Sequence, residues 1–268
     1  MYHNILITFI YCAPLSAQYF ELTDQTVYGG DDYDTPADII ESCDGGYYIL
    51  NTSVSGINGN KTVQNYGDSD YWLIKTDSLF NDEWQLSYGG ESLDEARTML
   101  HDAAGNIYLC GYAMGTSSGN RTVDAYGQVS YWVIKLDAYG NEIWQKAYGG
   151  DVVEYLHDAV IFNNKLYLLG SSSSGVSGVK SGFNRGGADY WLVCTNTAGN
   201  MLWDKTYGGN DSDYPKTLVA DSINGQIYIA GYSGSEASYE KSEDNIGNKD
   251  LWLLKVDATD GTLIRVCL

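Results

Sequence analysis

The sequence predicts an all-β protein made of four consecutive units, each about 60 residues long, as in repeat architectures. The triplet Tyr-Gly-Gly occurs four times at a nearly constant spacing, beginning at Tyr28, Tyr88, Tyr148 and Tyr207. Short apolar runs alternate with Asp-Gly, Asn-Gly and other turn residues along the whole chain. No segment carries a convincing helical period over a long stretch. Such a regular repeat indicates units that stack on one another.

Each unit is expected to contain four strands, of which the first two form a hairpin. The tight turn is Asp44-Gly45 in one unit and Asn224-Gly225 in another, because hairpin turns need central residues that accept positive φ. A Ser-, Gly- and Asn-rich segment of roughly 16 to 18 residues then leads to a third strand that is apolar on both faces, which predicts burial on both sides. The predicted second and third strands cover residues 47–51, 71–76, 107–111, 131–136, 166–170, 190–195, 227–231 and 251–256.

The fourth strand carries an apolar and a polar face, as an outer strand does. Trp84, Leu86 and Tyr88 share one face by alternation, and Gln85 and Ser87 share the other. Tryptophans recur in pairs at one constant spacing, and Trp252 alone lacks the second member, since Ile264 stands in its place. An aromatic side chain that every unit repeats is expected to be core, because its burial removes about 150–250 Å² from water. The pairs are Trp72/Trp84, Trp132/Trp144 and Trp191/Trp203.

Four strands in about 60 residues, repeated in tandem, is the pattern of propeller blades. Residues 18–268 are therefore expected to form one β-propeller domain after a leader at 1–17. Residues 24–29 and 262–267 both offer a strand of the fourth type for one closing position. Because four blades can close a ring, a compact four-bladed propeller is favoured, and an open partial ring of a longer array is the alternative. The expected four-stranded blades are 31–90, 91–150, 151–209 and 210–268.

The repeated phrases resemble those of a known group of secreted bacterial proteins. They are W-Q-K-A-Y-G-G, D-G-G-Y-Y-I-L, G-N-K-T and D-Y-W-L-I-K-T-D. The unit is similar to the tandem propeller repeats called delta-60 or SBBP-like, which are common in surface proteins of Bacteroidetes-type bacteria. The likeness covers residues 20–264. It implies a propeller architecture and export, and it implies little about activity.

Composition and charge limit the kinds of molecule that the protein is expected to bind. The chain has 35 acidic and 15 basic residues and a formal charge of −20, a field that repels phosphate backbones, so no nucleic-acid partner is expected. A polysaccharide or a protein ligand fits better.

Residues 1–17 are expected to be a secretory signal peptide, which places the protein outside the cell or in the periplasm. No other segment is apolar enough for a membrane span. Neither a disulfide nor the oligomeric state follows from the sequence.

Two sets of charged residues occupy fixed offsets in the units. The acids open the units, and four-fold repetition would set them around an axis as a site for a hard cation such as Ca²⁺. They are Asp34, Asp94, Glu154 and Asp213. The cations lie in the polar segments and offer the other interpretation, which is that acids and bases pair or that the acids cap the turn after Gly-Gly. They are Lys61, Arg121, Lys180 and Lys241.

A third column changes from unit to unit and is the candidate binding site. It contains Ala37, Arg97, His157 and Lys216. No catalytic residue and no cofactor can be named, since the chain has no nucleophile motif and no phosphate loop. The main functional interpretation is an exported, non-catalytic propeller that acts as a surface binding or scaffold module. The alternatives are a secreted glycan-active enzyme or its carbohydrate-binding part, and a purely structural spacer.

Overall fold

The computed structural model describes residues 25–264, and these form 15 strands and no helix. The expected signal peptide at 1–17 lies outside the described residues. The first sheet contains β1 (Asp34–Glu41), β2 (Tyr47–Ser53), β3 (Asp70–Thr76) and β4 (Asp82–Tyr88). The second contains β5 (Asp94–His101), β6 (Ile107–Met114), β7 (Val129–Leu136) and β8 (Glu142–Tyr148). The third contains β9 (Glu154–Phe162), β10 (Lys165–Ser172), β11 (Asp189–Asn196) and β12 (Met201–Tyr207). The fourth contains β13 (Asp213–Asp221), β14 (Gln226–Ser233) and β15 (Asp250–Asp257).

Each sheet is an antiparallel meander in which neighbours in sequence are neighbours in space. The eight strands predicted from the sequence are all present, and the turn residues Gly45, Asn163 and Asn164 have the expected positive φ. The fourth sheet has three named strands. Leu263 adds an isolated bridge to Val256, at the place where a fourth strand would begin.

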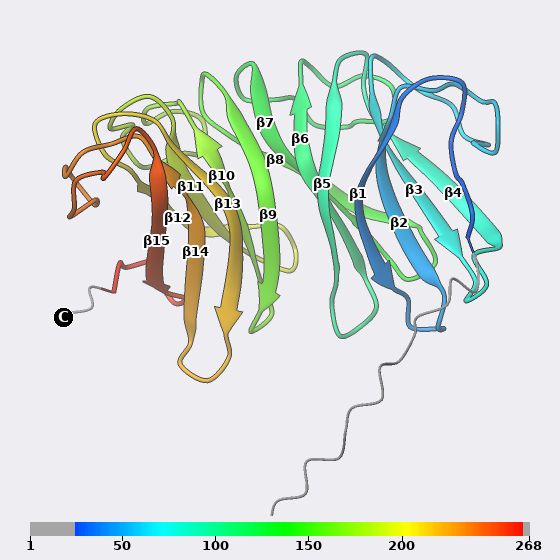
Figure 1. Ribbon diagram of the computed structural model, residues 1–268. Coiled ribbons are helices and arrows are strands. Elements are labelled where there is room, and N and C mark those ends of the chain that lie inside the picture. Colours follow the sequence, from blue (N-terminus) through cyan, green and yellow to red (C-terminus); the bar gives the residue numbers. More distant parts are fainter. Residues whose placement is uncertain (1–24, 265–268) are drawn as a thin grey trace, which may run out of the picture.

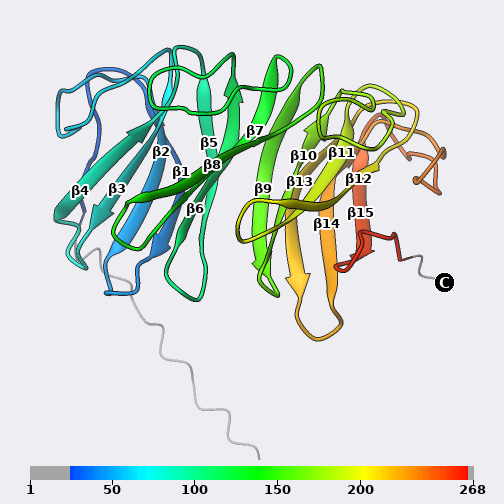
Figure 2. The ribbon, with the colours of Figure 1, turned by 180° about the vertical axis from the view of Figure 1, so that it is seen from behind.

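The four sheets stand side by side in an open arc. β1 contacts β5, β5 contacts β9, and β9 contacts β13, so the first strand of every sheet faces the same side of the arc (Figure 1). The view from behind shows the first and fourth sheets at opposite ends, and the long segments between second and third strands gather along one edge (Figure 2). The repeat and the all-β class are therefore confirmed. The arrangement is compatible with a propeller, but the sheets are not closed into a four-bladed ring.

Apolar side chains fill the space between successive sheets. The forward face of a sheet is the one turned toward the next sheet along the chain, and the rear face is the one turned toward the previous sheet; both faces are packed in this way only in the second and third sheets. In the first sheet the forward face includes Tyr71 and Leu73, and they pack against Trp132 and Ile134 on the rear face of the second sheet. The second and third sheets meet in the same way, as do the third and fourth. Trp72, Trp132 and Trp191 are completely buried. The other four tryptophans, Trp84, Trp144, Trp203 and Trp252, are partly buried and pack against the same clusters, so the prediction that the tryptophans are core is confirmed.

Three of the Tyr-Gly-Gly triplets mark the points where the chain passes from one sheet to the next, and the triplet at Tyr28 precedes the first sheet. A Cβ atom on Gly89 would lie 1.8 Å from Oδ1 of Asp70, and one on Gly208 would lie 2.0 Å from Oδ1 of Asp189. The second glycine donates its N–H to the acid that opens the next sheet, as Gly90 does to Asp94 at 2.6 Å. Only glycine leaves room for these contacts, which explains why the triplet recurs.

Candidate functional site

The varied column lies on a β-bulge in the first strand of each sheet. The register of β1 with β2 shifts between Pro36 and Asp38, so Ala37 has no partner on the neighbouring strand. The same shift occurs in β5, β9 and β13. A bulge frees one residue from the ladder and re-aims its side chain. The bulge residues are Ala37, Arg97, His157 and Lys216.

Because β1, β5, β9 and β13 are neighbours, the bulges bring this column to one surface, here called the inner surface. Arg97 is held there by three contacts. Its guanidinium pairs with Glu95 at 2.8 Å, donates to the hydroxyl of Tyr112 at 3.0 Å and stacks 5.1 Å from the centre of that ring. The Tyr112 hydroxyl in turn donates to Glu95. A carboxylate with two donors and a guanidinium with two partners are fixed in orientation, as a recognition site requires.

His157 and Lys216 continue the inner surface toward the fourth sheet. Burial lowers the pKa of His157 to about 4, with smaller contributions from the charges of Lys216 and Arg97. The imidazole is therefore neutral at pH 7, and its Nε2 lies 3.4 Å from Oγ of Ser171. The ammonium of Lys216 lies 5.7 Å from the centre of the Tyr232 ring. The sequence thus predicted three residues, Arg97, His157 and Lys216, that the fold does bring onto one surface.

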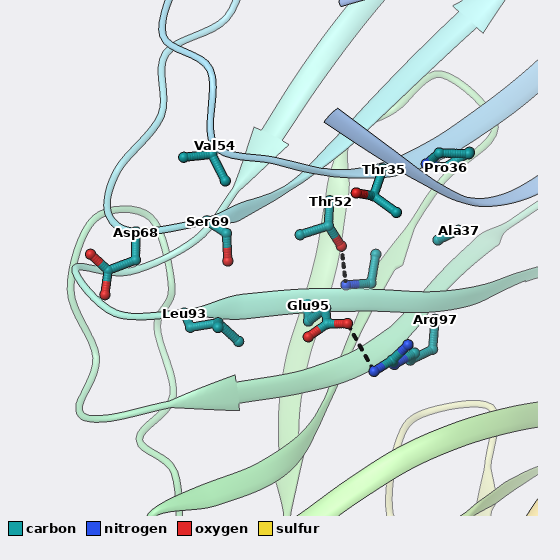
Figure 3. Close-up of a pocket in the computed structure, with 11 residues that line it drawn as sticks. Thr35, Pro36, Ala37, Thr52, Val54, Asp68, Ser69, Leu93, Glu95 and Arg97 are labelled. Carbon is teal, nitrogen blue, oxygen red and sulfur yellow. Dashed lines mark hydrogen bonds and ion pairs between the residues drawn. The ribbon is translucent and has the colours of Figure 1, made fainter. Parts of the chain in front are cut away.

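A pocket of about 380 Å³ opens beside Arg97, between β1 and β5. It exists because the first sheet carries small residues where the second sheet carries large ones: Thr35 and Thr52 pair where Glu95 and Tyr112 pair, and Ala37 replaces Arg97. Figure 3 shows Asp68 and Glu95 among the polar groups around this hollow. A pocket of this volume is large enough for a small ligand. Its polar lining residues are Thr35, Thr52, Asp68, Ser69, Glu95 and Arg97.

The four repeated acids lie at the starts of the first strands and accept hydrogen bonds from the backbone. Each is fully or partly buried and accepts the N–H of a second glycine four residues earlier, at 2.6 to 2.8 Å. Among residues 25–264 no three His, Cys, Asp or Glu side chains are grouped so that they could hold one metal ion. The acids therefore do not meet as the ring of ligands that their spacing suggested. They are Asp34, Asp94, Glu154 and Asp213.

The repeated cations pair with an acid in one unit of the described chain. Arg121 binds Asp94 at 2.8 Å with both side chains buried. Lys61 instead donates to Oγ of Ser53 and the carbonyl of Ser55, and Lys180 donates to a backbone carbonyl. The interpretation of the acids as turn caps is thus confirmed in all four units, and the interpretation as ion pairs in the second unit.

Sequence reasoning missed Glu95, Tyr112 and Asp68. Glu95 follows Asp94 directly, so strand alternation places it on the opposite face from that buried acid, and this signal could have found it. Tyr112 lies opposite Glu95 in the register of β5 and β6. Asp68 lies in the long segment before β3, where no pattern in the sequence marks it.

Comparisons with known proteins give a distant structural likeness. Neither protein-family models nor curated proteins gave a match. Solved structures of an apocarotenoid oxygenase from Synechocystis are similar: a tryptophan-to-alanine mutant (13% identity, TM-score 0.42) and the cobalt-substituted protein (14%, 0.44). A chimera titled ACO/RPE65 gives 14% and 0.43. In each case the match covers 86% of this chain and 48% of the other, so the chain spans about half the length of those proteins.

These neighbours differ from one prediction. They carry the names of an oxygenase and of a chimera of it, so they do not support the interpretation of the chain as a non-catalytic binding or scaffold module. No helix in residues 25–264 is long and apolar enough to cross a membrane.

Proposed function

We propose that this protein is a secreted glycan-active enzyme, or the carbohydrate-binding part of one, and that the pocket between β1 and β5 holds a sugar unit of a neutral polysaccharide. The observation that carries the proposal is the pocket's lining. A fixed Glu95–Arg97 pair, a second carboxylate at Asp68 and the hydroxyls of Thr35 and Thr52 surround a hollow of about 380 Å³. Sugars are recognised by such mixtures of donors and acceptors, because each hydroxyl both donates and accepts.

Charge favours a neutral polymer over an acidic one. The net charge of −20 repels polyanions, and the only cation in the pocket lining, Arg97, already pairs with Glu95. Asp68 and Glu95 are the two carboxylates that line the pocket, and most glycosidic hydrolysis uses a pair of carboxylates. The resemblance of the repeats to secreted SBBP-like arrays supports export, as does the leader expected at 1–17.

The test fills the pocket without changing the scaffold. Ala37→Arg places in the first sheet the residue that the second sheet carries at the same bulge, so the fold should tolerate it. We expect it to abolish binding of neutral oligosaccharides in calorimetric titrations against a glycan panel. Ala237→Arg, at an exposed loop position, adds the same charge elsewhere and should leave binding unchanged. Equal binding by both variants would place the site outside the pocket.

A second pair of variants separates enzyme from binding part. Glu95→Gln should weaken binding by roughly tenfold or more, since a hydrogen bond to a charged group contributes about 1.5–3 kcal/mol. Release of reducing ends is measured on the same polysaccharides with Glu95→Gln and Asp68→Asn. Activity that both variants lose identifies a hydrolytic pair, whereas binding without release identifies a carbohydrate-binding part. A wild-type protein that neither binds nor cleaves any neutral glycan would contradict the proposal.

A further inference from the structure

The fourth sheet presents an apolar face that no other part of residues 25–264 covers. On the forward faces of the second and third sheets the third-strand residues, such as Tyr131 and Val133, are completely buried by the next sheet. The equivalent residues of the fourth sheet, Leu251 and Leu253, are 72% and 65% exposed. Leu253 also lines an apolar groove of about 260 Å³ with Val219 and Tyr228. A contiguous apolar face of this kind marks an interaction surface.

The junctions inside the chain show what covers such a face. At each one a forward-face tyrosine donates its hydroxyl to the backbone carbonyl of the next sheet's tryptophan. The bonds run from Tyr71 to Trp132, from Tyr131 to Trp191 and from Tyr190 to Trp252, at 3.3, 3.0 and 3.5 Å. A glycine faces the hydroxyl each time, because a Cβ there would lie only 2.3 to 2.5 Å from it. These glycines are Gly111, Gly170 and Gly231.

The two ends of the arc depart from this pattern in a matched way. The fourth sheet has Leu251 in place of the tyrosine, and the first sheet has Asn51 in place of the glycine. Asn51 donates its own Nδ2 to the carbonyl of Trp72 at 3.3 Å, so that carbonyl needs no tyrosine from a neighbour. Leucine opposite asparagine is sterically compatible, whereas tyrosine opposite asparagine is not. The two exceptions are complementary to each other.

A second match lies at the bulges. Asp38 accepts the N–H of Met99 in the second sheet at 2.8 Å, and Asp158 accepts the N–H of Leu218 in the fourth sheet at 3.0 Å. The third sheet instead satisfies the equivalent N–H itself, since Asp158 also accepts from Ala159. The first sheet does the same through Asp38 and Ile39. At the junction between the second and third sheets, therefore, this N–H is satisfied within the third sheet and no aspartate bonds to it across the junction. A junction between a fourth sheet and a first sheet would have the same hydrogen bonding.

The first sheet also carries the tyrosine that a preceding sheet would supply. Tyr148 donates to the carbonyl of Gly199 and Tyr207 to that of Gly261, each across a junction. Tyr28 makes the same contact with the carbonyl of Phe80 at 2.6 Å. On the rear face of the first sheet Ile39, the equivalent of Met99 in the second sheet, remains 54% exposed. The rear face of the first sheet thus has the contacts and the exposed apolar side chain that are expected of a face that packs against another sheet.

We propose that the forward face of the fourth sheet binds the rear face of the first sheet of a second copy of this chain, head to tail. Three filled junctions fix the arc and hold its own first and fourth sheets at opposite ends (Figures 1 and 2), so these two faces do not meet within one arc. The contact is heterologous, since two different surfaces meet. Leu251 of one copy then covers Asn51 of the next.

The first experiment measures the mass of the full chain in solution by light scattering. The wild type should give two or more chains of 29.5 kDa, while Ile39→Asp and Leu253→Asp should each give one. A mixture of the two variants should form a dimer, because each contributes the face that the other has lost. Ile223→Asp, at an exposed turn, is the control and should associate as the wild type does. Circular dichroism checks that all variants are folded.

Two outcomes would overturn the proposal. A wild type of 29.5 kDa up to about 100 μM would mean that the faces do not join two copies with useful affinity. Association that survives Ile39→Asp and is lost in Leu253→Asp would mean a symmetric contact between two fourth sheets.

A second experiment tests the matched pair directly. Leu251→Tyr should weaken the association at least tenfold, because the ring meets Asn51 of the next copy. Adding Asn51→Gly should restore it by rebuilding the tyrosine–glycine contact of the internal junctions. Equal association of wild type, single and double variants would show that residues 251 and 51 do not meet.

Discussion

Replacement of Asp189 by asparagine tests how charge is buried between the sheets. The Asp189 carboxyl is completely buried at the start of β11. Its Oδ2 accepts the N–H of Arg185 at 2.7 Å, while its Oδ1 has no hydrogen-bond partner. Burial raises the pKa of Asp189 from the ordinary value of 3.8 to about 7, the Arg185 N–H opposes this, and the charge of Asp213 adds to it. A rise of about three units corresponds to about 4 kcal/mol.

The sign of the effect follows from the direction of the shift. Between about pH 4 and pH 7 the folded protein keeps a proton on Asp189 that the unfolded chain has released. Protonation therefore favours the folded state, and this contribution to stability is lost as the pH rises to about 7 and beyond. Asp189→Asn has no such proton to lose. The free energy of unfolding of the variant minus that of the wild type should therefore be larger at pH 8 than at pH 4, by up to about 4 kcal/mol.

Urea unfolding followed by circular dichroism at pH 4 and pH 8 measures this difference. Asp137→Asn is the control with the opposite sign, because hydrogen bonds from Asn141 and Tyr139 lower the pKa of that exposed turn carboxyl. Its removal should cost stability at pH 8 and little at pH 4. A change in unfolding free energy on Asp189→Asn that is the same at both pH values would refute the reasoning.

Two further substitutions test the packing. Trp132→Ala should lower the free energy of unfolding by about 3–5 kcal/mol, because Trp132 is completely buried between the first and second sheets; an equal effect of Tyr139→Ala, at an exposed turn, would contradict this. Gly89→Ala should cost about 2 kcal/mol or more, because the new Cβ would lie 1.8 Å from Asp70. Gly175→Ala, where a Cβ meets no atom within 4 Å, should be nearly neutral in the same denaturant titration.

The strands and turns were predictable because each depends on local chemistry. Positive φ at Gly45 and Asn163 follows from the residue types at hairpin turns, and the burial of Trp132 follows from its recurrence. Ring closure was not predictable in this way. It depends on the angle between packed sheets and on whether the end faces match. Single exceptions to the repeat, such as Leu251 and Asn51, can be interpreted only when the residues that they face are known.

The candidate site was predictable in part. Variation within a repeat pointed to Arg97 and His157, but only the bulges show why these side chains reach one surface. The pocket was not predictable, since it arises from what Ala37 and its neighbours lack. The contacts of the repeated acids were predictable only as one of two interpretations, because backbone N–H groups, such as that of Gly90, are donors that a side-chain pattern does not display.

The residues that repeat in every unit and the residues that vary between units therefore have different roles. A residue that every unit repeats, such as Glu154 or Trp191, is buried and satisfies a contact that every sheet must make. A residue that one unit changes is free to serve a ligand, as around Ala37, or to end the series, as Leu251 does. Substitutions in the repeated columns should thus act on folding, and those in the varied columns on binding or association, which is the separation that the pocket and junction variants are designed to measure.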